Sequence, residues 1–541
     1  MIERLIENWL TRADERTLQV IFSYILTAEG YTIIHISRHC SMEMGKDIIA
    51  IAPDGTPCAY QLKSLKSKRL TLNAWRHEIQ PQILDLVAGI NHPSVNKSKC
   101  HKSYLVINGK IEEEVTRSID DMNIKWKNSN QKYELNIITE GEIFNKAKKL
   151  GINIWQSDLS VWKNVLELYL NNGKGILPKK KIANIFEKLF PFKKNEKKKI
   201  PSKNHLANII SSSAILCLIS ISSFTMAKNY VAEIEAWTIY LSYVLALVDK
   251  WHLLKKYWER EFEFVLEYIY LSLQNLCEEL KVRKNYVEGL VLVDKEFFHV
   301  RITWLIALMS IYGLWNRCRH NIEEDHEEFI KEFCSKNFKN MKLWGEAAIF
   351  QFILYFWYFK KINPTREPDD LLANLIYAIS KFNAPDSAKC LANTYYEAND
   401  ILPYKLGLEK EDISMNFKGQ SYTIEGLINL YVRLNWKQSM KLLWPDATRL
   451  TFIEFEPKYK WHYYRWHNEE GTYKTVVPRI PKTWNELKKE SFESEGKLLP
   501  TTLKKHPIFV LLFLLVYPHR VNSQLLRWLD SQIRKIPRTI N

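Results

Sequence analysis

The sequence predicts an α/β domain at the N-terminus, a mixed sheet flanked by helices, followed by a large all-α C-terminal region. Two observations indicate this. Helical and β-prone segments alternate through the first 150 residues, the order typical of a sheet covered by helices. From Tyr230 onward, apolar residues recur almost throughout at helical spacing. We expect a domain over 1–150, a helix and Lys-rich linker over 151–204, and a helical region over 205–541.

Length and composition describe a folded protein of a reducing compartment. The 541 residues are too many for one ordinary core, and 46% of them are hydrophobic. The eight cysteines include no Cys-x-x-Cys pair, so neither a disulfide framework nor a zinc site is indicated. The N-terminus is charged and helical, unlike a secretory signal, and we expect a cytoplasmic protein. Walker A, GxGxxG and His-Glu-x-x-His motifs are absent from the sequence, which argues against an NTPase, a dinucleotide enzyme or a zincin.

The N-terminal domain begins with a helix, a strand and a hairpin. Apolar spacing predicts a helix over 17–29, which Gly30-Tyr31 ends before the β-prone run 32–36. Residues 48–52 and 58–62 read as two strands joined by the turn Pro53-Asp54-Gly55-Thr56. The sequence therefore predicts a β-hairpin directly after the first strand.

Helices and strands then alternate to the end of the domain. In order, we expect a helix over 73–88, a strand over 104–107, a helix over 111–121, a strand over 135–139 and a helix over 140–149. Pro81 could interrupt the first of these helices. Its residues Gln80 and Gln82 lie either beside the hairpin or on an ordinary solvated face.

Polar groups collect at one end of the hairpin. Because side chains on a strand alternate between faces, Gln61 and Lys63 share one side, and Asp47 at the mouth of the first strand can lie beside them. A carboxylate, a second oxygen ligand and an ammonium are the groups that a metal-dependent phosphodiesterase needs. A solvated hairpin carrying an Asp and a Lys is the structural alternative.

The order Asp47 followed by Gln61-Leu62-Lys63 resembles the PD-(D/E)xK restriction-endonuclease-like superfamily, in its Mrr-like branch. In that branch Gln replaces the usual acid before x-Lys, and the domain begins, as here, with a helix, Gly-Tyr and a strand. The resemblance covers about the first 150 residues. It implies a nuclease fold and a DNA endonuclease that depends on Mg²⁺ or Mn²⁺, with Asp47, Gln61 and Lys63 at its centre.

One position departs from the family pattern. The first helix of Mrr-like domains usually offers a Glu to the metal, but this register holds Gln19, while Glu15 lies four residues earlier on the same helical face. Either Glu15 substitutes, Gln19 serves as a neutral ligand, or Asp47 and backbone carbonyl groups hold the ion alone. We expect Asp47 and Gln61 to bind Mg²⁺ with Glu15 or Gln19, and Lys63 to position the attacking water.

Basic residues suggest an anionic partner. The formal net charge is +16, and residues 151–204 contain 12 Lys and Arg against 4 Asp and Glu. This segment either follows nucleic-acid phosphates or is a solvated linker. Next to the hairpin, Lys66, Lys68 and Arg69 are assigned to nucleic-acid binding.

Two further segments allow alternatives. Residues 206–227 carry no formal charge and could span a bilayer, but eight of them are Ser, Thr or Asn, which favours a core helix. In residues 452–467, aromatic and basic residues alternate and could stack bases of a single strand. The favoured interpretation is a hairpin that packs these aromatic rings onto the helices.

The leading hypothesis is therefore a metal-dependent DNA endonuclease, and the resemblance implies a role in bacterial anti-phage defence or restriction. We expect a homo-oligomer, because cutting both strands usually takes two active sites, and a partner protein from the same defence system is possible. The alternatives are a catalytically inactive nucleic-acid-binding protein and an effector tethered to a membrane through 206–227.

Overall fold

In a computed structural model, the protein forms two compact units. The first comprises Met1–Ala227 with Lys255–Glu261, and the second comprises Lys228–Leu254 with Phe262–Asn541. Within them, the structure describes residues 15–36, 45–65, 69–90, 95, 100–151, 159–192, 201–282, 295–319, 324–362, 367–388, 390–405, 418–467, 470–477, 482–493 and 501–537. The first unit therefore contains both the N-terminal sheet and the helices that follow it through residue 227.

A mixed five-stranded sheet is the centre of the first unit, which confirms the predicted α/β class of this part. Its strand order is β1-β2-β3-β5-β7. The first two neighbouring pairs are antiparallel and the last two are parallel. The strands are β1 (Thr32–Ile36), β2 (Ile48–Ile51), β3 (Pro57–Lys63), β5 (Lys102–Ile107) and β7 (Leu135–Ile138), and a short ladder joins β4 (Arg69–Leu70) to β6 (Lys110–Ile111).

The predicted hairpin is confirmed as β2 and β3. Gly55 has a φ of 80°, a conformation that favours glycine, and Thr56 N–H donates to Asp54 Oδ1 at 2.8 Å. Ala52 N–H then donates to Thr56 O at 2.9 Å and closes the turn. Because β2 and β3 are antiparallel, the start of β2 and the end of β3 lie at the same end of the sheet.

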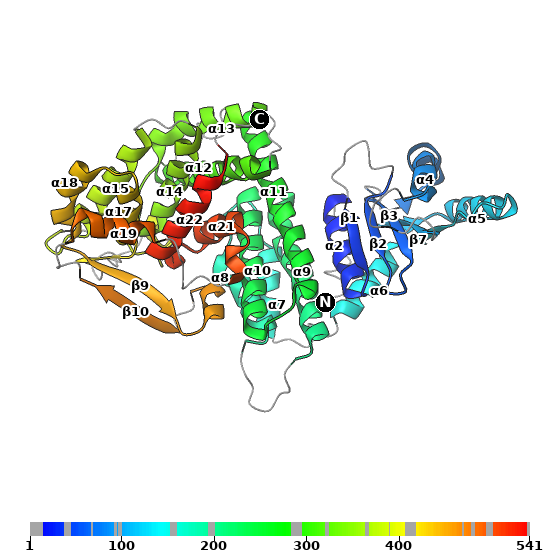
Figure 1. Cartoon of the computed structure of the whole chain (residues 1–541). Helices are drawn as coiled ribbons and strands as arrows, with labels where there is room; N and C mark the ends of the chain where they lie inside the picture. The colour runs from blue at the N-terminus through cyan, green and yellow to red at the C-terminus, as the bar shows by residue number, and fades with distance from the viewer. Residues whose placement is uncertain are drawn as a thin grey trace. The chain divides into compact units, whose positions relative to one another are not determined.

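Helices cover both faces of the sheet (Figure 1). On one face lie α2 (Glu15–Ala28) and α6 (Glu140–Gly151), and on the other lie α4 (Gln80–Val87) and α5 (Glu113–Asn128). The Tyr60 ring packs toward α2, with its centroid 5.4 Å from that of Phe22. Since successive side chains on β3 alternate between faces, its neighbour Gln61 points toward α4.

The helix expected over 73–88 is present in three joined segments, α3 (Leu72–Ala74), a π-helical segment (Trp75–Ile79) and α4. Pro81 does not break it. This residue lies in the first turn of α4, where a missing N–H and a fixed φ are tolerated.

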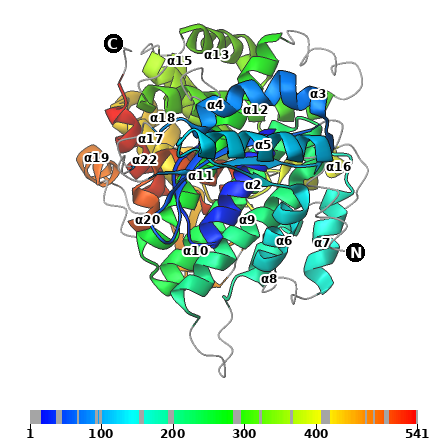
Figure 2. The ribbon, with the colours of Figure 1, turned by 90° about the vertical axis from the view of Figure 1, so that its right-hand side faces the viewer.

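Three more helices belong to the first unit: α7 (Leu159–Tyr169), α8 (Lys179–Leu189) and α9 (Lys203–Met226). The lysines at 179–181 thus form the first turn of a helix inside the segment expected to be a linker. In two views α9 lies beside α2, and it also packs against α7 (Figures 1 and 2). This contact covers the face of α2 that is turned away from the sheet.

Among the described helices, three are long and apolar enough to cross a membrane by length and composition alone. They are α9, α10 (Tyr230–Trp251) and α12 (Lys295–Arg319), and 78%, 94% and 78% of their apolar windows are buried inside the protein. Most of their apolar surface is therefore buried inside the protein.

The second unit is helical for the most part. Its other helices are α11 (Glu259–Val282), whose first turn belongs to the first unit, and α13 (Glu324–Asn337), α14 (Ile349–Ile362), α15 (Glu367–Phe382), α16 (Ala398–Lys405), α17 (Ile424–Arg433), α18 (Lys437–Ala447), α19 (Trp484–Phe492), α20 (Thr501–Lys504), α21 (Pro507–Val516) and α22 (Ser523–Lys535).

The C-terminal region is not all-α, which corrects the prediction. A three-stranded sheet with the order β10-β9-β8 lies among the helices, formed by β8 (Gln420–Ser421), β9 (Thr451–Pro457) and β10 (Gly471–Val476). In the run Ile453-Glu454-Phe455-Glu456, apolar and acidic residues alternate with strand periodicity, and the buried Ile453 and Phe455 on one face explain the folding of this segment onto the core.

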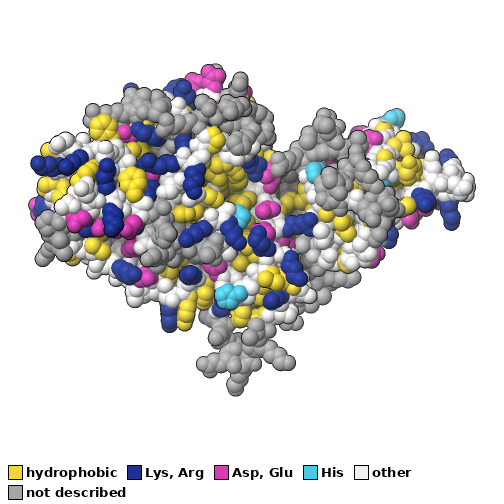
Figure 3. All heavy atoms as spheres, in the orientation of Figure 1, with side chains coloured by type: hydrophobic (Ala, Val, Ile, Leu, Met, Phe, Trp, Pro, Cys, Tyr) yellow, Lys and Arg dark blue, Asp and Glu magenta, His cyan; other side chains and the backbone are white. Residues whose placement is uncertain are grey.

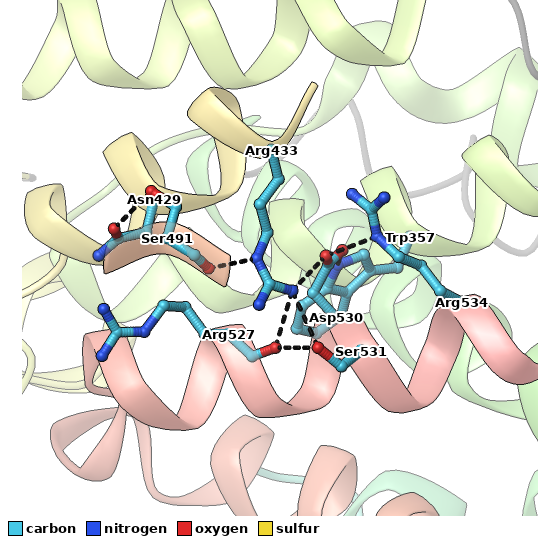
Figure 4. A network of polar contacts seen from close by, with 8 residues as sticks. All are labelled: Trp357, Asn429, Arg433, Ser491, Arg527, Asp530, Ser531 and Arg534. Carbon is cyan, nitrogen blue, oxygen red and sulfur yellow. Dashed lines mark hydrogen bonds and ion pairs between the residues drawn. The ribbon is translucent and has the colours of Figure 1, made fainter. Parts of the chain in front are cut away.

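A buried polar network joins α14, α17, α19 and α22 in the second unit (Figure 4). Arg433 Nη1 lies 2.7 Å from Asp530 Oδ2, and Arg433 Nε donates to the carbonyl oxygen of Ser491 at 2.6 Å. Trp357 Nε1 donates to the other oxygen of Asp530 at 3.1 Å. Because the buried charges are paired and hydrogen-bonded, the network fixes how these helices pack.

Candidate active site

Asp47 is fixed at the mouth of the hairpin by hydrogen bonds on both sides of Gln61. Its N–H donates to the carbonyl oxygen of Tyr60 at 2.8 Å, and its Oδ2 accepts from the N–H of Leu62 at 2.6 Å. From α2, Gln19 Nε2 donates to the carbonyl oxygen of Asp47 at 3.0 Å. The structure thus brings Gln19 and Asp47 to the part of β3 that contains Gln61, although these residues are far apart in the sequence. The Gln61 side chain itself points toward α4.

Two consecutive hydrogen bonds between amide groups hold the Gln61 side chain. Gln82 Nε2 donates to the carbonyl oxygen of Glu78 at 3.0 Å, which leaves Gln82 Oε1 as an acceptor. Gln61 Nε2 donates to this oxygen at 2.7 Å. Because its NH₂ group is engaged in this way, the Gln61 oxygen must point away from Gln82.

The Gln61 oxygen has no hydrogen-bond donor among the residues that the structure describes, although Gln61 is only 2% exposed. A buried acceptor without a donor costs about 1 to 3 kcal/mol. Protein interiors avoid such groups, and those that persist call for an explanation, such as a bound ion or a catalytic role. The oxygen of Gln61 is therefore the strongest sign of a ligand site in this unit.

Lys63 and Glu15 form the outer part of the site. The Lys63 Nζ and Glu15 Oε1 atoms are 3.6 Å apart, and the two side chains are 24% and 32% exposed. Glu15 and Gln19 are four residues apart on α2, so they lie on the same face of the helix. One helix face thus contacts both Lys63 and Asp47.

Two residues before Asp47 join this loop to α4. Gly45 has a φ of 66°, and a Cβ atom there would lie 3.2 Å from the carbonyl oxygen of Gln82. The Lys46 ammonium is buried and donates to the carbonyl oxygen of Asp85, and burial lowers the pKa of Lys46. A side chain at position 45 would push the loop away from α4, which carries Gln82.

Asn108 holds the chain just beyond Lys63. The side chain is 1% exposed, its Oδ1 accepts from the N–H of Leu65 at 2.7 Å, and its Nδ2 donates to Ser64 Oγ at 3.1 Å. In the sequence, Asn108 followed by Gly109 indicates only a turn. Because β5 lies next to β3 in parallel, Asn108 at the end of β5 can hydrogen-bond to the residues that follow Lys63.

The donor set suits a hard cation better than a soft one. Asp47, Gln61 and Glu15 offer carboxylate and amide oxygens, the ligands that Mg²⁺ prefers. Within the described residues, no group of three or more His, Cys, Asp or Glu side chains is placed to hold a metal. Any ion here would therefore bind through one or two carboxylates together with the Gln61 oxygen.

The basic residues after the hairpin are described only in part. Lys66 and Lys68 lie outside the described residues. The Arg69 side chain is 61% exposed, and its Nε lies 3.5 Å from Glu112 Oε1. Arg69 is thus accessible, but a neighbouring carboxylate offsets its charge.

Sequence reasoning placed Gln82 on the hairpin side only as one of two options, and it assigned no role to Glu78 or Asn108. The register of a helix against a strand decides these contacts, and this register is not encoded in local periodicity.

Comparison with family models, curated proteins and solved structures gave no match.

Proposed function

We propose that the first unit hydrolyses phosphodiester bonds of DNA with the help of Mg²⁺ or Mn²⁺. The observation that carries the proposal is the buried Gln61 oxygen without a donor among the described residues. The two residues that flank Gln61 both hydrogen-bond to Asp47, Leu62 through the Asp47 carboxylate and Tyr60 through the Asp47 N–H. The order Asp47…Gln61-x-Lys63, which resembles the PD-(D/E)xK superfamily, supports the same chemistry.

In this proposal, Asp47, Gln61 and Glu15 hold the ion, which would supply Lewis-acid stabilisation and lower the pKa of a bound water. Gln19 keeps the Asp47 backbone in place through its amide. Lys63 orients the attacking water and offsets the negative charge that develops on the phosphate. Glu15 holds the Lys63 ammonium near this position, since the two groups are 3.6 Å apart.

Cleavage of supercoiled plasmid DNA with Mg²⁺ or Mn²⁺ tests the proposal. We expect Asp47→Ala and Lys63→Ala to abolish cleavage, and Lys125→Ala, an exposed lysine on α5, to cut at the wild-type rate. If both site variants cut like the wild-type protein, the assignment of the site is wrong.

A second candidate is a nucleic-acid-binding module without catalysis. The observation that favours it is the paired state of Glu15 with Lys63, which leaves amides at two of the expected ligand positions, Gln19 and Gln61. Such a protein would bind DNA with a steep salt dependence and would cut under no divalent metal.

The predicted role in anti-phage defence, together with a homo-oligomer or a partner protein, extends this proposal. Cutting both strands of a duplex usually takes two sites, so the proposed enzyme would act as a pair of chains. The membrane-tethered alternative predicts that cell fractionation finds the chain with membranes, although α9 is largely covered within the first unit.

A further inference from the structure

The second unit presents two aromatic rings side by side at its surface, just after β9. The rings of Tyr459 and Trp461 are parallel within 5°, with centroids 6.2 Å apart. Tyr459 is 52% exposed and Trp461 is half-buried. We call these two residues, together with the cations Lys250, Lys458, Lys460 and Arg465 around them, the aromatic platform.

Core packing explains the neighbouring aromatic residues but not the platform. Tyr463 and Tyr464 are buried, and the Tyr463 hydroxyl donates to the carbonyl oxygen of Arg520 at 2.6 Å. Tyr459 instead remains exposed, next to the exposed lysines 458 and 460. The alternating segment 452–467 is thus divided by the fold into a buried part and a surface part.

The buried ring of His462 contacts both platform rings. Its ring is 1% exposed and meets Trp461 nearly edge-on, at 3.9 Å and 84°, and Tyr459 at 5.2 Å and 88°. The Nδ1 atom of His462 hydrogen-bonds to the carbonyl oxygen of Glu470 at 3.2 Å, which holds the buried ring between the turn and β10.

Cationic groups surround the platform. Lys250 Nζ lies 4.4 Å from the centre of the Trp461 ring, and Arg465 Cζ lies 5.2 Å from it. Lys458 Nζ lies 5.7 Å from the centre of the Tyr459 ring. Glu470, 3.6 Å from Arg465 Nη1, offsets part of this charge.

The nearest acid on α10, Asp249, is held among buried groups and offsets only part of the remaining charge, that of Lys460. Thr502 Oγ1 donates to Asp249 Oδ1 at 3.1 Å, and burial raises the pKa of Asp249. The platform therefore retains a positive surface that suits an anionic partner.

Charge alone would not identify this site. On the face drawn in Figure 3, Lys and Arg side chains are scattered over the surface and do not form one continuous track. The distinguishing feature is the combination of parallel exposed rings with flanking cations. Stacking surfaces for bases next to contacts for phosphates are the usual features of proteins that bind single strands.

We propose that the aromatic platform binds single-stranded nucleic acid, with unpaired bases stacking on Tyr459 and Trp461 and phosphates contacting the surrounding Lys and Arg side chains. A protein partner fits less well, because lysine is depleted at the centre of protein interfaces. This inference does not depend on the proposed nuclease activity, since every residue of the platform belongs to the second unit.

The test measures fluorescence anisotropy of labelled oligo-dT, oligo-rU and a duplex of the same length, with full-length protein in EDTA so that no cleavage occurs. We expect platform variants to weaken binding of the single strands and to leave binding of the duplex unchanged, because the base faces of a duplex are hidden and the first unit would supply any duplex binding. Tyr459→Ala should weaken single-strand binding at least about fivefold, the lower end for loss of one stacking contact. Tyr459→Phe should bind like the wild-type protein, because it keeps the ring.

Tyr377→Ala is the matched control. Tyr377 is a 53% exposed tyrosine with Lys381 Nζ 5.6 Å from its ring centre, on α15 and outside the platform. Its binding should be unchanged, and Lys458→Ala with Lys460→Ala should reduce the salt slope by about 1.4. Equal losses of duplex and single-strand binding in Tyr459→Ala, or equal effects of Tyr459→Ala and Tyr377→Ala on single-strand binding, would overturn the proposal. Preference for dT or for rU then tells DNA from RNA as the source of the strand.

Discussion

Replacing Gln61 with Met tests whether the Gln61 amide acts in DNA cleavage or in the stability of the fold. Met has nearly the shape of Gln but carries no amide. The substitution removes the Gln61 oxygen, a buried acceptor without a donor among the described residues, which should stabilise the fold by about 1 to 3 kcal/mol. It also removes the hydrogen bond to Gln82, which should destabilise the fold by about 0.5 to 1.5 kcal/mol. Gln82 is exposed, so water can replace its lost partner. We therefore expect Gln61→Met to leave stability unchanged or to raise it by up to about 2 kcal/mol, while DNA cleavage is lost.

Amide hydrogen exchange measures the effect locally, on peptides that cover β3, because the two units of the chain need not unfold together. Gln351→Met is the matched control in the second unit. Gln351 on α14 is also 2% exposed, and its oxygen also lacks a donor among the described residues. This variant should show a similar change in stability around α14 and wild-type cleavage.

Two results would refute this reasoning. Cleavage by Gln61→Met at the wild-type rate would show that the amide oxygen takes no part in the reaction. A loss of more than about 2 kcal/mol in the stability of β3 would show that the Gln61 amide is a structural group, since its single hydrogen bond is worth less than that.

Three further predictions follow from the geometry. Gln82→Leu leaves the buried Gln61 NH₂ group without its acceptor and should cost about 1 to 3 kcal/mol of stability. It should also reduce plasmid cleavage roughly 10-fold to 100-fold, the usual effect of losing a group that orients a metal ligand, and raise the Mg²⁺ concentration for half-maximal rate. Arg433→Met should destabilise the second unit by about 3 kcal/mol in urea unfolding, because it leaves the buried Asp530 without its main counter-charge. Arg534 also pairs with Asp530, but its side chain is 49% exposed, so Arg534→Met should cost about 1 kcal/mol or less. Burial and the neighbouring Glu425 carboxylate raise the pKa of Glu454 from 4.5 to about 7. Between these two pH values Glu454 is protonated in the folded state and ionised in the unfolded state. The stability of the second unit should then fall by up to about 3 kcal/mol as pH rises through this window, and thermal unfolding of Glu454→Gln should show a flatter pH profile.

Local sequence features anticipated most of the first unit. The run Ile48–Ile51, the turn with Asp54 and Gly55, and the strand ending at Lys63 form the predicted hairpin. These elements follow from β-propensity and turn chemistry, which act between neighbouring residues. The sheet order and the parallel pairing of β3 with β5 were expected only as a class, a mixed sheet, because pairing partners come from distant segments.

The C-terminal strands were anticipated only in part, for a related reason. The favoured interpretation of residues 452–467 was a hairpin that packs its aromatic rings onto the helices. In the structure β9 does form a strand there, but its antiparallel partner β10 lies beyond this segment, and the connection includes a 3₁₀ turn at Lys460–Tyr464. The same pairing placed Tyr459 and Trp461 outside the core.

The amino-acid sequence by itself determined which chemical groups the N-terminal domain carries and where the hairpin bears Asp47, Gln61 and Lys63, because strand periodicity and turns are local properties. Tertiary structure alone decided that Gln82 engages the Gln61 amide and that Glu15 meets Lys63. Those contacts depend on how α2 and α4 pack on opposite faces of one sheet, and side-chain packing over distances of 20 residues or more leaves no periodic signal in the chain.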